Sequence, residues 1–299
     1  MYFFYKKFCY LLVLYCLLTF NTLFKADSCS QVIEPDPIGN FSLPISQQPG
    51  TLFGLGQHVV EKGDFLLETF VTQLRGKKKN TIIADPYVLY GITDDLSFVV
   101  NVPVFVKSRY NDLHSSGIGD IFPVLEYAYY TKPTKKTYTQ FTVVGGVTLA
   151  TGSDTKIPNT GFGSSAFFLG LTFAYWTQRF YFFGSVGTNQ TTTNNNRTKF
   201  GNSYIYQFGG SVNLGDWRPG WIFALGCEFN GLYTQRDQIS GAINANSGGN
   251  VIFFGPSFFA SNEKLIFQIG LQGTVFQHLF GVQNHNTYLF ALNVGWKFN

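Results

Sequence analysis

The closing stretch of the chain, Asn286–Asn299, alternates between two kinds of side chain with a period of two. Successive side chains of a β-strand point to opposite faces, so this pattern predicts a strand. One face is apolar along its length and carries Tyr288, Phe290, Leu292, Val294, Trp296 and Phe298. The other is small or polar and carries Leu289, Ala291, Asn293, Gly295 and Lys297. A soluble sandwich strand also alternates, but aromatics near both tips of the apolar face are typical of a strand that crosses a bilayer beside a polar lumen.

The same alternation recurs through most of the chain. It predicts earlier strands at residues 64–74, 81–90, 96–108, 118–130, 141–150, 166–176, 180–188, 204–214, 221–234, 251–260 and 265–277. Most of these runs are long enough for a tilted strand, which needs about nine to eleven residues to cross the hydrocarbon. After the first pair of strands, short turns alternate with longer loops, as they do at the two ends of a transmembrane barrel. We therefore predict an all-β fold: a transmembrane, antiparallel, up-and-down β-barrel of about twelve strands over residues 63–299.

Two features of the predicted barrel concern its regularity. Pro103 lies inside the run 96–108 and removes a donor from the strand ladder, so we expect a local defect there. Residues 109–117 are polar, and we expect them to form a longer connection between strands.

The composition agrees with a barrel and excludes other classes. Charged residues make up 13% of the chain and aromatic residues 18%, while the mean hydropathy is near zero. After the N-terminus there is no run of about 18 apolar residues, which a membrane-spanning helix would need. The net charge of +4 is spread over turns, so we expect no nucleic-acid partner. No cluster of cysteine and histidine predicts a metal site, and we expect no cofactor.

The N-terminal region has the features of a secretory signal. Lys6 and Lys7 precede an apolar run, residues 8–20, that is too short to span as a helix, and we predict a signal peptide over residues 1–26. Lipidation of Cys29 is an open alternative. Residues 27–62 contain several prolines and no sustained period. They form either a periplasmic lead-in, which we favour, or a short plug that enters the barrel.

Short turn and strand patterns in the chain resemble those of a known family. They are Glu61–Phe65 (EKGDF), Tyr90–Ser97 (YGITDDLS), Gly117–Asp120 (GIGD) and the step Thr160–Gly161. From about Gly50 to its end, the chain resembles the outer-membrane channel family named after the meta-cleavage pathway of phenol degradation. The resemblance implies a barrel that passes small, often aromatic, compounds. The terminal strand also resembles the closing segment of bacterial outer-membrane proteins, which the barrel-assembly machinery recognises.

Polar side chains on the predicted inner faces are the candidate pore lining. They are Glu68, Asp85, Lys107, Asp120, Glu126, Glu228, Asn230, Gln268 and Gln272. A ring of acidic residues biases permeation in channels, although polar residues that only pair across strands would give the same pattern. The register also places four glycines and four phenylalanines inward: Gly146, Gly209, Gly226, Gly270, Phe105, Phe253, Phe259 and Phe276.

These observations predict an outer-membrane channel for passive diffusion of small, hydrophobic or aromatic solutes. Its partners would be outer-membrane lipid, the barrel-assembly machinery and the solute. One alternative is a non-transporting surface barrel whose loops bind something outside the cell. A remote alternative is a lipase-like enzyme, but the histidines at positions 58, 114, 278 and 285 fall in connections or in the lead-in, so we expect no catalysis.

Overall fold

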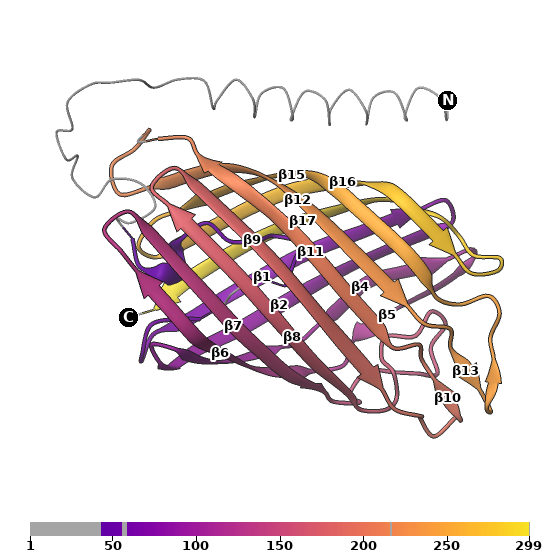
Figure 1. Ribbon diagram of the computed structural model, residues 1–299. Helices are drawn as coiled ribbons and strands as arrows, with labels where there is room; N and C mark the ends of the chain where they lie inside the picture. Colours follow the sequence, from indigo (N-terminus) through magenta and orange to yellow (C-terminus); the bar gives the residue numbers. More distant parts are fainter. Residues whose placement is uncertain (1–42, 56–58, 216, 299) are drawn as a thin grey trace, which may run out of the picture. The chain divides into compact units, whose positions relative to one another are not determined.

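The computed structural model describes residues 43–55, 59–215 and 217–298 (Figure 1). The predicted signal peptide (residues 1–26), Cys29 and the first part of the predicted lead-in (residues 27–42) lie outside the described residues. In the described part of the chain, no helix is long and apolar enough to cross a bilayer.

Almost every regular element of the described chain is a strand. A single 3-10 turn, η1, occupies Ile45–Gln47. The strands are β1 (Phe65–Gly76), β2 (Lys79–Thr93), β3 (Leu96–Asn101), β4 (Val104–Tyr110), β5 (Leu113–Ile118), β6 (Phe122–Pro133), β7 (Thr137–Thr148), β8 (Ala166–Thr177), β9 (Phe180–Thr191), β10 (Thr198–Lys199), β11 (Ser203–Asn213), β12 (Ile222–Thr234), β13 (Gln238–Ile239), β14 (Ala242–Ile243), β15 (Gly249–Ser261), β16 (Leu265–Leu279) and β17 (Asn286–Phe298).

The large antiparallel sheet closes on itself, as the sequence predicts. Strand β1 pairs with β2 on one side and with β17 on the other, so the described sheet has no free edge at this seam. Strands β3 and β4 both pair with β2 and form two halves of one wall strand, and β5 and β6 form the next. Counted in this way, the described residues build a barrel of twelve wall strands. Closure satisfies the main-chain hydrogen bonds that lipid cannot satisfy.

The two ends of the barrel differ in their connections. Short turns at residues 94–95, 134–136, 178–179 and 262–264 lie at the end where β1 begins and β17 ends. Longer loops at residues 149–165, 192–202 and 235–248 lie at the other end, and β10, β13 and β14 form a small separate sheet from two of them (Figure 1). In outer-membrane barrels the short turns are periplasmic and the long loops extracellular. We call the two ends the periplasmic and the outer end accordingly.

The alternation in β17 separates a lipid face from a lumen face. Val294, Trp296 and Phe298 are 44%, 46% and 46% exposed, which is large for apolar side chains, while Asn293 and Lys297 are buried. Exposed apolar residues on successive wall strands form the band that lipid covers in a membrane. The inner face therefore carries the polar residues, as predicted.

The barrel departs from a regular ladder where the sequence predicts a defect and also where it does not. Strand β3 ends at Asn101 and β4 begins at Val104, so Pro103 interrupts the wall as expected. The prediction of a longer connection over residues 109–117 is wrong. Residues 111–112 make a tight turn between β4 and β5, and Asn111 has a φ of 55°. Asparagine tolerates this left-handed conformation, which allows the two strands to reverse within two residues.

Candidate functional site: the lumen and its inner segment

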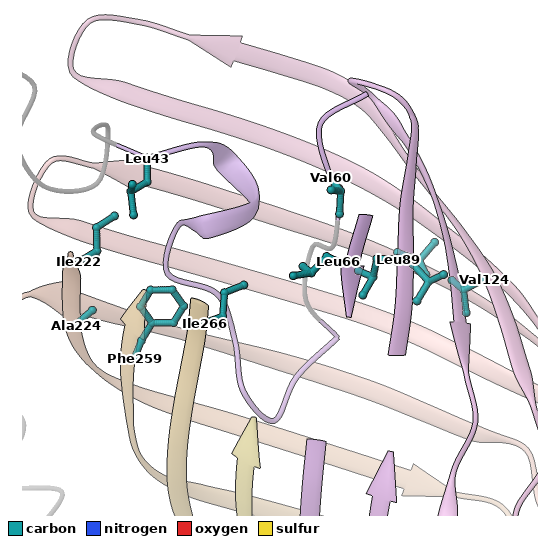
Figure 2. Packing of buried hydrophobic residues seen from close by; sticks show 11 residues of the cluster. Leu43, Val60, Leu66, Leu89, Val124, Ile222, Ala224, Phe259 and Ile266 are labelled. Carbon is teal, nitrogen blue, oxygen red and sulfur yellow. The ribbon is translucent and has the colours of Figure 1, made fainter. Parts of the chain in front are cut away.

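The barrel lumen contains chain from before the first strand. We call residues 43–55 and 59–62 the inner segment. Its Leu43 and Val60 belong to one apolar cluster with residues that point inward from the wall (Figure 2). The wall residues of this cluster are Leu66, Leu89, Val99, Val124, Val144, Ile222, Ala224, Phe259 and Ile266. Because these residues come from strands around the barrel, the inner segment fills the periplasmic half of the lumen with an apolar core.

A second cluster fixes the first turn of the inner segment. The rings of Trp176 and Tyr181 stack with centroids 5.0 Å apart, and Ile45 packs against this group. The indole Nε1 of Trp176 donates a hydrogen bond to the carbonyl oxygen of Pro49 at 3.0 Å. Trp176 is only 3% exposed, so this bond satisfies a buried indole donor.

Glu228 is the main polar anchor of the inner segment. Its carboxylate, on β12, accepts hydrogen bonds from the Thr51 hydroxyl at 2.7 Å and from the main-chain N–H groups of Leu52 (2.9 Å) and Phe53 (3.0 Å). Glu228 is 2% exposed. A buried carboxylate needs such donors, and hydrogen bonds to charged groups stabilise more than neutral ones.

Other inward side chains bind the main chain of the inner segment. The Gln207 Oε1 atom accepts from Leu55 N–H at 2.6 Å, and the Ser97 hydroxyl accepts from Val60 N–H at 2.8 Å. The Ser261 hydroxyl donates to the Gln47 carbonyl at 2.7 Å. These contacts come from strands β3, β11 and β15, so the segment is held from several sides of the lumen.

An ionic contact joins the inner segment to the last strand. The Lys297 Nζ atom lies 2.9 Å from a carboxylate oxygen of Glu61 and 2.7 Å from one of Asp64. The Ser46 hydroxyl also donates to Glu61, at 2.6 Å. Burial alone would raise the pKa of Glu61, but the hydrogen bonds from Ser46 and Lys297 outweigh it and hold this pKa below its ordinary value of 4.5.

Seven of the predicted lining residues lie on the inner face of the wall. Gln268, besides Glu228, binds the inner segment, since its side-chain amide donates to the Gly50 carbonyl at 3.2 Å. Glu68 accepts from Asn293, and Asp85 accepts from Asn101. The remaining inward residues, Glu126, Asn230 and Gln272, are buried. The predicted polar residues therefore lie together on the inner face. Some of them, however, form hydrogen bonds to the inner segment and do not line an open pore.

Asp120 is buried and serves another element. Its two carboxylate oxygens accept from Gly152 N–H at 2.8 Å and from Phe162 N–H at 2.6 Å. Both donors belong to the loop at residues 149–165, near its two ends. Asp120 thus fixes this extracellular loop against the wall. The GIGD pattern, which ends in Asp120, therefore marks the residue that anchors the loop.

Two inward placements predicted from the alternation are wrong, because the strands contain bulges. Phe105 pairs with Ile83, but Lys107 pairs with Ile82, so one extra residue moves Lys107 to the outer face, where it is exposed. In the same way an extra residue in β16 pairs Phe276 with Ile252, and Phe276 is 49% exposed. A shift of one residue reverses the face of every side chain beyond it.

The apolar cluster in the periplasmic half of the lumen was not predicted from the sequence. A signal for it exists in β9, which is apolar on both faces. Tyr181 and Phe183 of β9 are 2% and 7% exposed and belong to the cluster around Trp176. Apolar side chains on the inner face of a wall strand would be exposed to water in an open lumen. Their presence in β9 therefore indicates that another part of the polypeptide packs inside the barrel.

Comparison with solved structures supports the fold. A crystal structure of an outer-membrane channel from Pseudomonas putida F1 superposes with a TM-score of 0.67 over 80% of this chain and 97% of that chain, at 14% identity. LpxR from Salmonella typhimurium (TM-score 0.44, 7% identity, 78% of this chain and 99% of that chain) and the Pseudomonas putida toluene transporter TodX (0.34, 9%, 80% and 90%) also match, at scores too low to carry an argument. No curated protein matches the sequence.

The fold and its apolar outer band confirm the predicted location in a bacterial outer membrane. A family model described as "Putative MetA-pathway of phenol degradation" matches residues 51–284. This match covers the inner segment from Thr51 onward and nearly all of the wall. The chain belongs to this family.

Proposed function

We propose that the protein is an outer-membrane channel for passive diffusion of small hydrophobic solutes, aromatic compounds among them, and that the inner segment closes its lumen at rest. The hydrogen bonding of Glu228 is the observation that carries this proposal. Three bonds from Thr51, Leu52 and Phe53 hold the segment at one buried carboxylate. A hydrogen bond to a charged group contributes about 1.5–3 kcal/mol. These contacts are made by a wall side chain, so the main-chain hydrogen bonds of the wall do not depend on them.

The inner face offers surfaces that suit an aromatic solute. Phe70 and Tyr87 meet edge to face with ring centroids 5.1 Å apart, and Phe122 and Phe168 do so at 6.1 Å. Tyr87, Phe122 and Phe168 pack against the apolar cluster that includes the inner segment, so withdrawal of the segment would uncover aromatic rings. Asn101 lies between Tyr87 and Phe122 in the strand pairing, and apolar walls with a few polar groups are typical of small-molecule sites. The family description, which names phenol degradation, supports an aromatic solute, and the structural likeness to an outer-membrane channel supports a channel.

The positions of the histidines argue against a lipase-like enzyme. The prediction that the histidines fall in connections is wrong for His114, which lies in β5, and for His278, which lies near the outer end of β16. His285 precedes β17, and His58 lies outside the described residues. The three described histidines therefore stand at the outer rim and not beside the buried polar residues of the lumen. We therefore propose a role without catalysis. The terminal strand, with its exposed Val294, Trp296 and Phe298, is the segment that we propose the barrel-assembly machinery binds.

Uptake of an aromatic solute tests this proposal. Because small hydrophobic solutes need only brief openings of the lumen, we expect cells that produce the protein to take up radiolabelled toluene faster than cells with an empty vector, when both keep an intact outer membrane. An equal amount of a folded, unrelated barrel is the control for membrane damage. Equal uptake by all three strains would contradict the channel and would favour a surface barrel that acts through its loops.

A further inference from the structure

A second site lies at the outer end of the barrel, where the β4–β5 hairpin meets the loop at residues 149–165. A cavity of about 750 Å³ is lined by Val106, Lys107, Arg109, Asp112, His114, Ser115, Ser116, Lys156 and Ile157. We call it the rim pocket. Strand register places Lys107 and Arg109 of β4 on the face opposite the buried Ser108, and His114 of β5 pairs with Arg109. The loop at residues 149–165 completes the pocket, because the Lys156 Nζ atom donates to the Ser116 carbonyl at 2.6 Å.

The charge of the rim pocket favours an anion. Lys107, Arg109 and Lys156 carry three positive charges against the single carboxylate of Asp112. Arginine and lysine are the side chains that bind phosphate best, arginine through its fork of donors and lysine as a point charge.

The pocket lies at the outer end of the barrel, since Lys107 and Arg109 are near the end of β4, which reverses into β5 at residues 111–112. Cations that flank the apolar band are typical of the membrane interface. Near these cations, the apolar side chains of Val106, Ile118 and Ile157 are 57%, 56% and 66% exposed. Exposed apolar side chains beside positive charges match a lipid with acyl chains and a phosphorylated headgroup.

We propose that the rim pocket binds the phosphate headgroup of an outer-leaflet lipid, with the acyl chains against Val106 and Ile118. The site is separate from the inner segment, because no described residue of that segment lines it. The bulge in β4 contributes to this proposed site, because it turns the Lys107 side chain from the lumen face to the outer face.

Lipid binding to the purified protein in detergent tests the proposal. The probe is diphosphorylated lipid A, counted by native mass spectrometry, beside the same lipid without phosphates and inorganic phosphate alone. Each cation near an anionic membrane surface contributes about fivefold in affinity. The variant Lys107→Ser, Arg109→Ser, Lys156→Ser should therefore lose at least about tenfold in affinity for lipid A.

A matched variant controls for general charge. Lys132→Ser, Lys135→Ser, Lys136→Ser removes three exposed cations from the turn at the periplasmic end and should bind lipid A as the unmodified protein does. The dephosphorylated lipid should bind the unmodified protein as weakly as lipid A binds the pocket variant. Migration of unboiled samples on gels shows that each barrel is folded. Equal lipid A binding by the pocket variant, or binding of inorganic phosphate in place of the lipid, would overturn the proposal.

Discussion

At the scale of single residues, three buried charges of this barrel have specific partners. Glu228 holds main-chain N–H groups, Asp120 holds a loop, and Lys297 joins two carboxylates. The inward face of these residues could be predicted from the period of two. Their partners could not, because Thr51 and Glu228 are 177 residues apart and no local pattern links them.

The ionic contact of Lys297 gives a prediction for pH. Because the pKa of Glu61 lies below its ordinary 4.5, the stabilisation is present above pH 4.5 and is lost as the pH falls through the lowered value. We expect the inner segment to loosen only in strong acid and to stay fixed between pH 5 and pH 8. Emission of Trp176 reports this, in a variant with Trp217, Trp221 and Trp296 replaced by phenylalanine.

Water reaches the Trp176 indole when Pro49 withdraws, so its emission should shift to the red below pH 4.5. The variant Lys297→Met is the comparison, because it removes the cation at every pH. The two carboxylates are about a quarter exposed, so its cost lies between about 1 kcal/mol for a surface pair and about 3–5 kcal/mol for a buried one. We expect the Lys297→Met protein to be red-shifted already at pH 7. Equal emission of the two proteins at pH 7 would show that the contact between Lys297 and Glu61 does not hold the segment.

At the scale of the elements, the strands and the break at Pro103 could be predicted, and the bulges could not. The period of two identifies each wall strand, and the lengths of the connections show which end of the barrel is periplasmic and which is the outer end. The bulges in β4 and β16 each insert one residue, which changes no composition and leaves no turn signal. Asp112 and Asn111 make the turn of the β4–β5 hairpin in a stretch whose polar residues resemble a loop.

The loop at residues 149–165 provides a prediction at this scale. Asp120→Ala removes both main-chain hydrogen bonds that fix its ends, each of which contributes about 1.5–3 kcal/mol. The open loop should then be at least about tenfold more populated, and cleavage by trypsin after the exposed Lys156 should accelerate in proportion. The wall should melt at nearly the same temperature.

The variant Glu263→Ala is the matched control, because it removes an exposed carboxylate from a turn at the other end of the barrel. We expect its cleavage rate to equal that of the unmodified protein. An unchanged rate for Asp120→Ala would mean that the neighbouring hydrogen bond from Ser153 N–H to Thr160 fixes the loop without Asp120.

At the scale of the whole molecule, the closed wall could be predicted, but the sequence left open whether residues 27–62 lead into the barrel or plug it. Closure follows from the apolar outer face, since a sheet in lipid must leave no strand edge unpaired. Residues 27–62 have no period, so sequence alone favoured a periplasmic lead-in. The described part of them packs instead against inward apolar residues such as Leu66 and Phe259, which would otherwise face an aqueous lumen.

Conductance of single molecules in a planar bilayer tests the closed lumen most directly. The unmodified protein should give no steady current steps, because the inner segment fills the periplasmic half of the barrel. Glu228→Ala removes three hydrogen bonds from the segment and should give discrete openings. Asp85→Asn, which changes an inward carboxylate bonded to Asn101 on the wall, should stay silent. Steady steps of equal size from the unmodified protein and from Glu228→Ala would contradict a lumen closed by the inner segment.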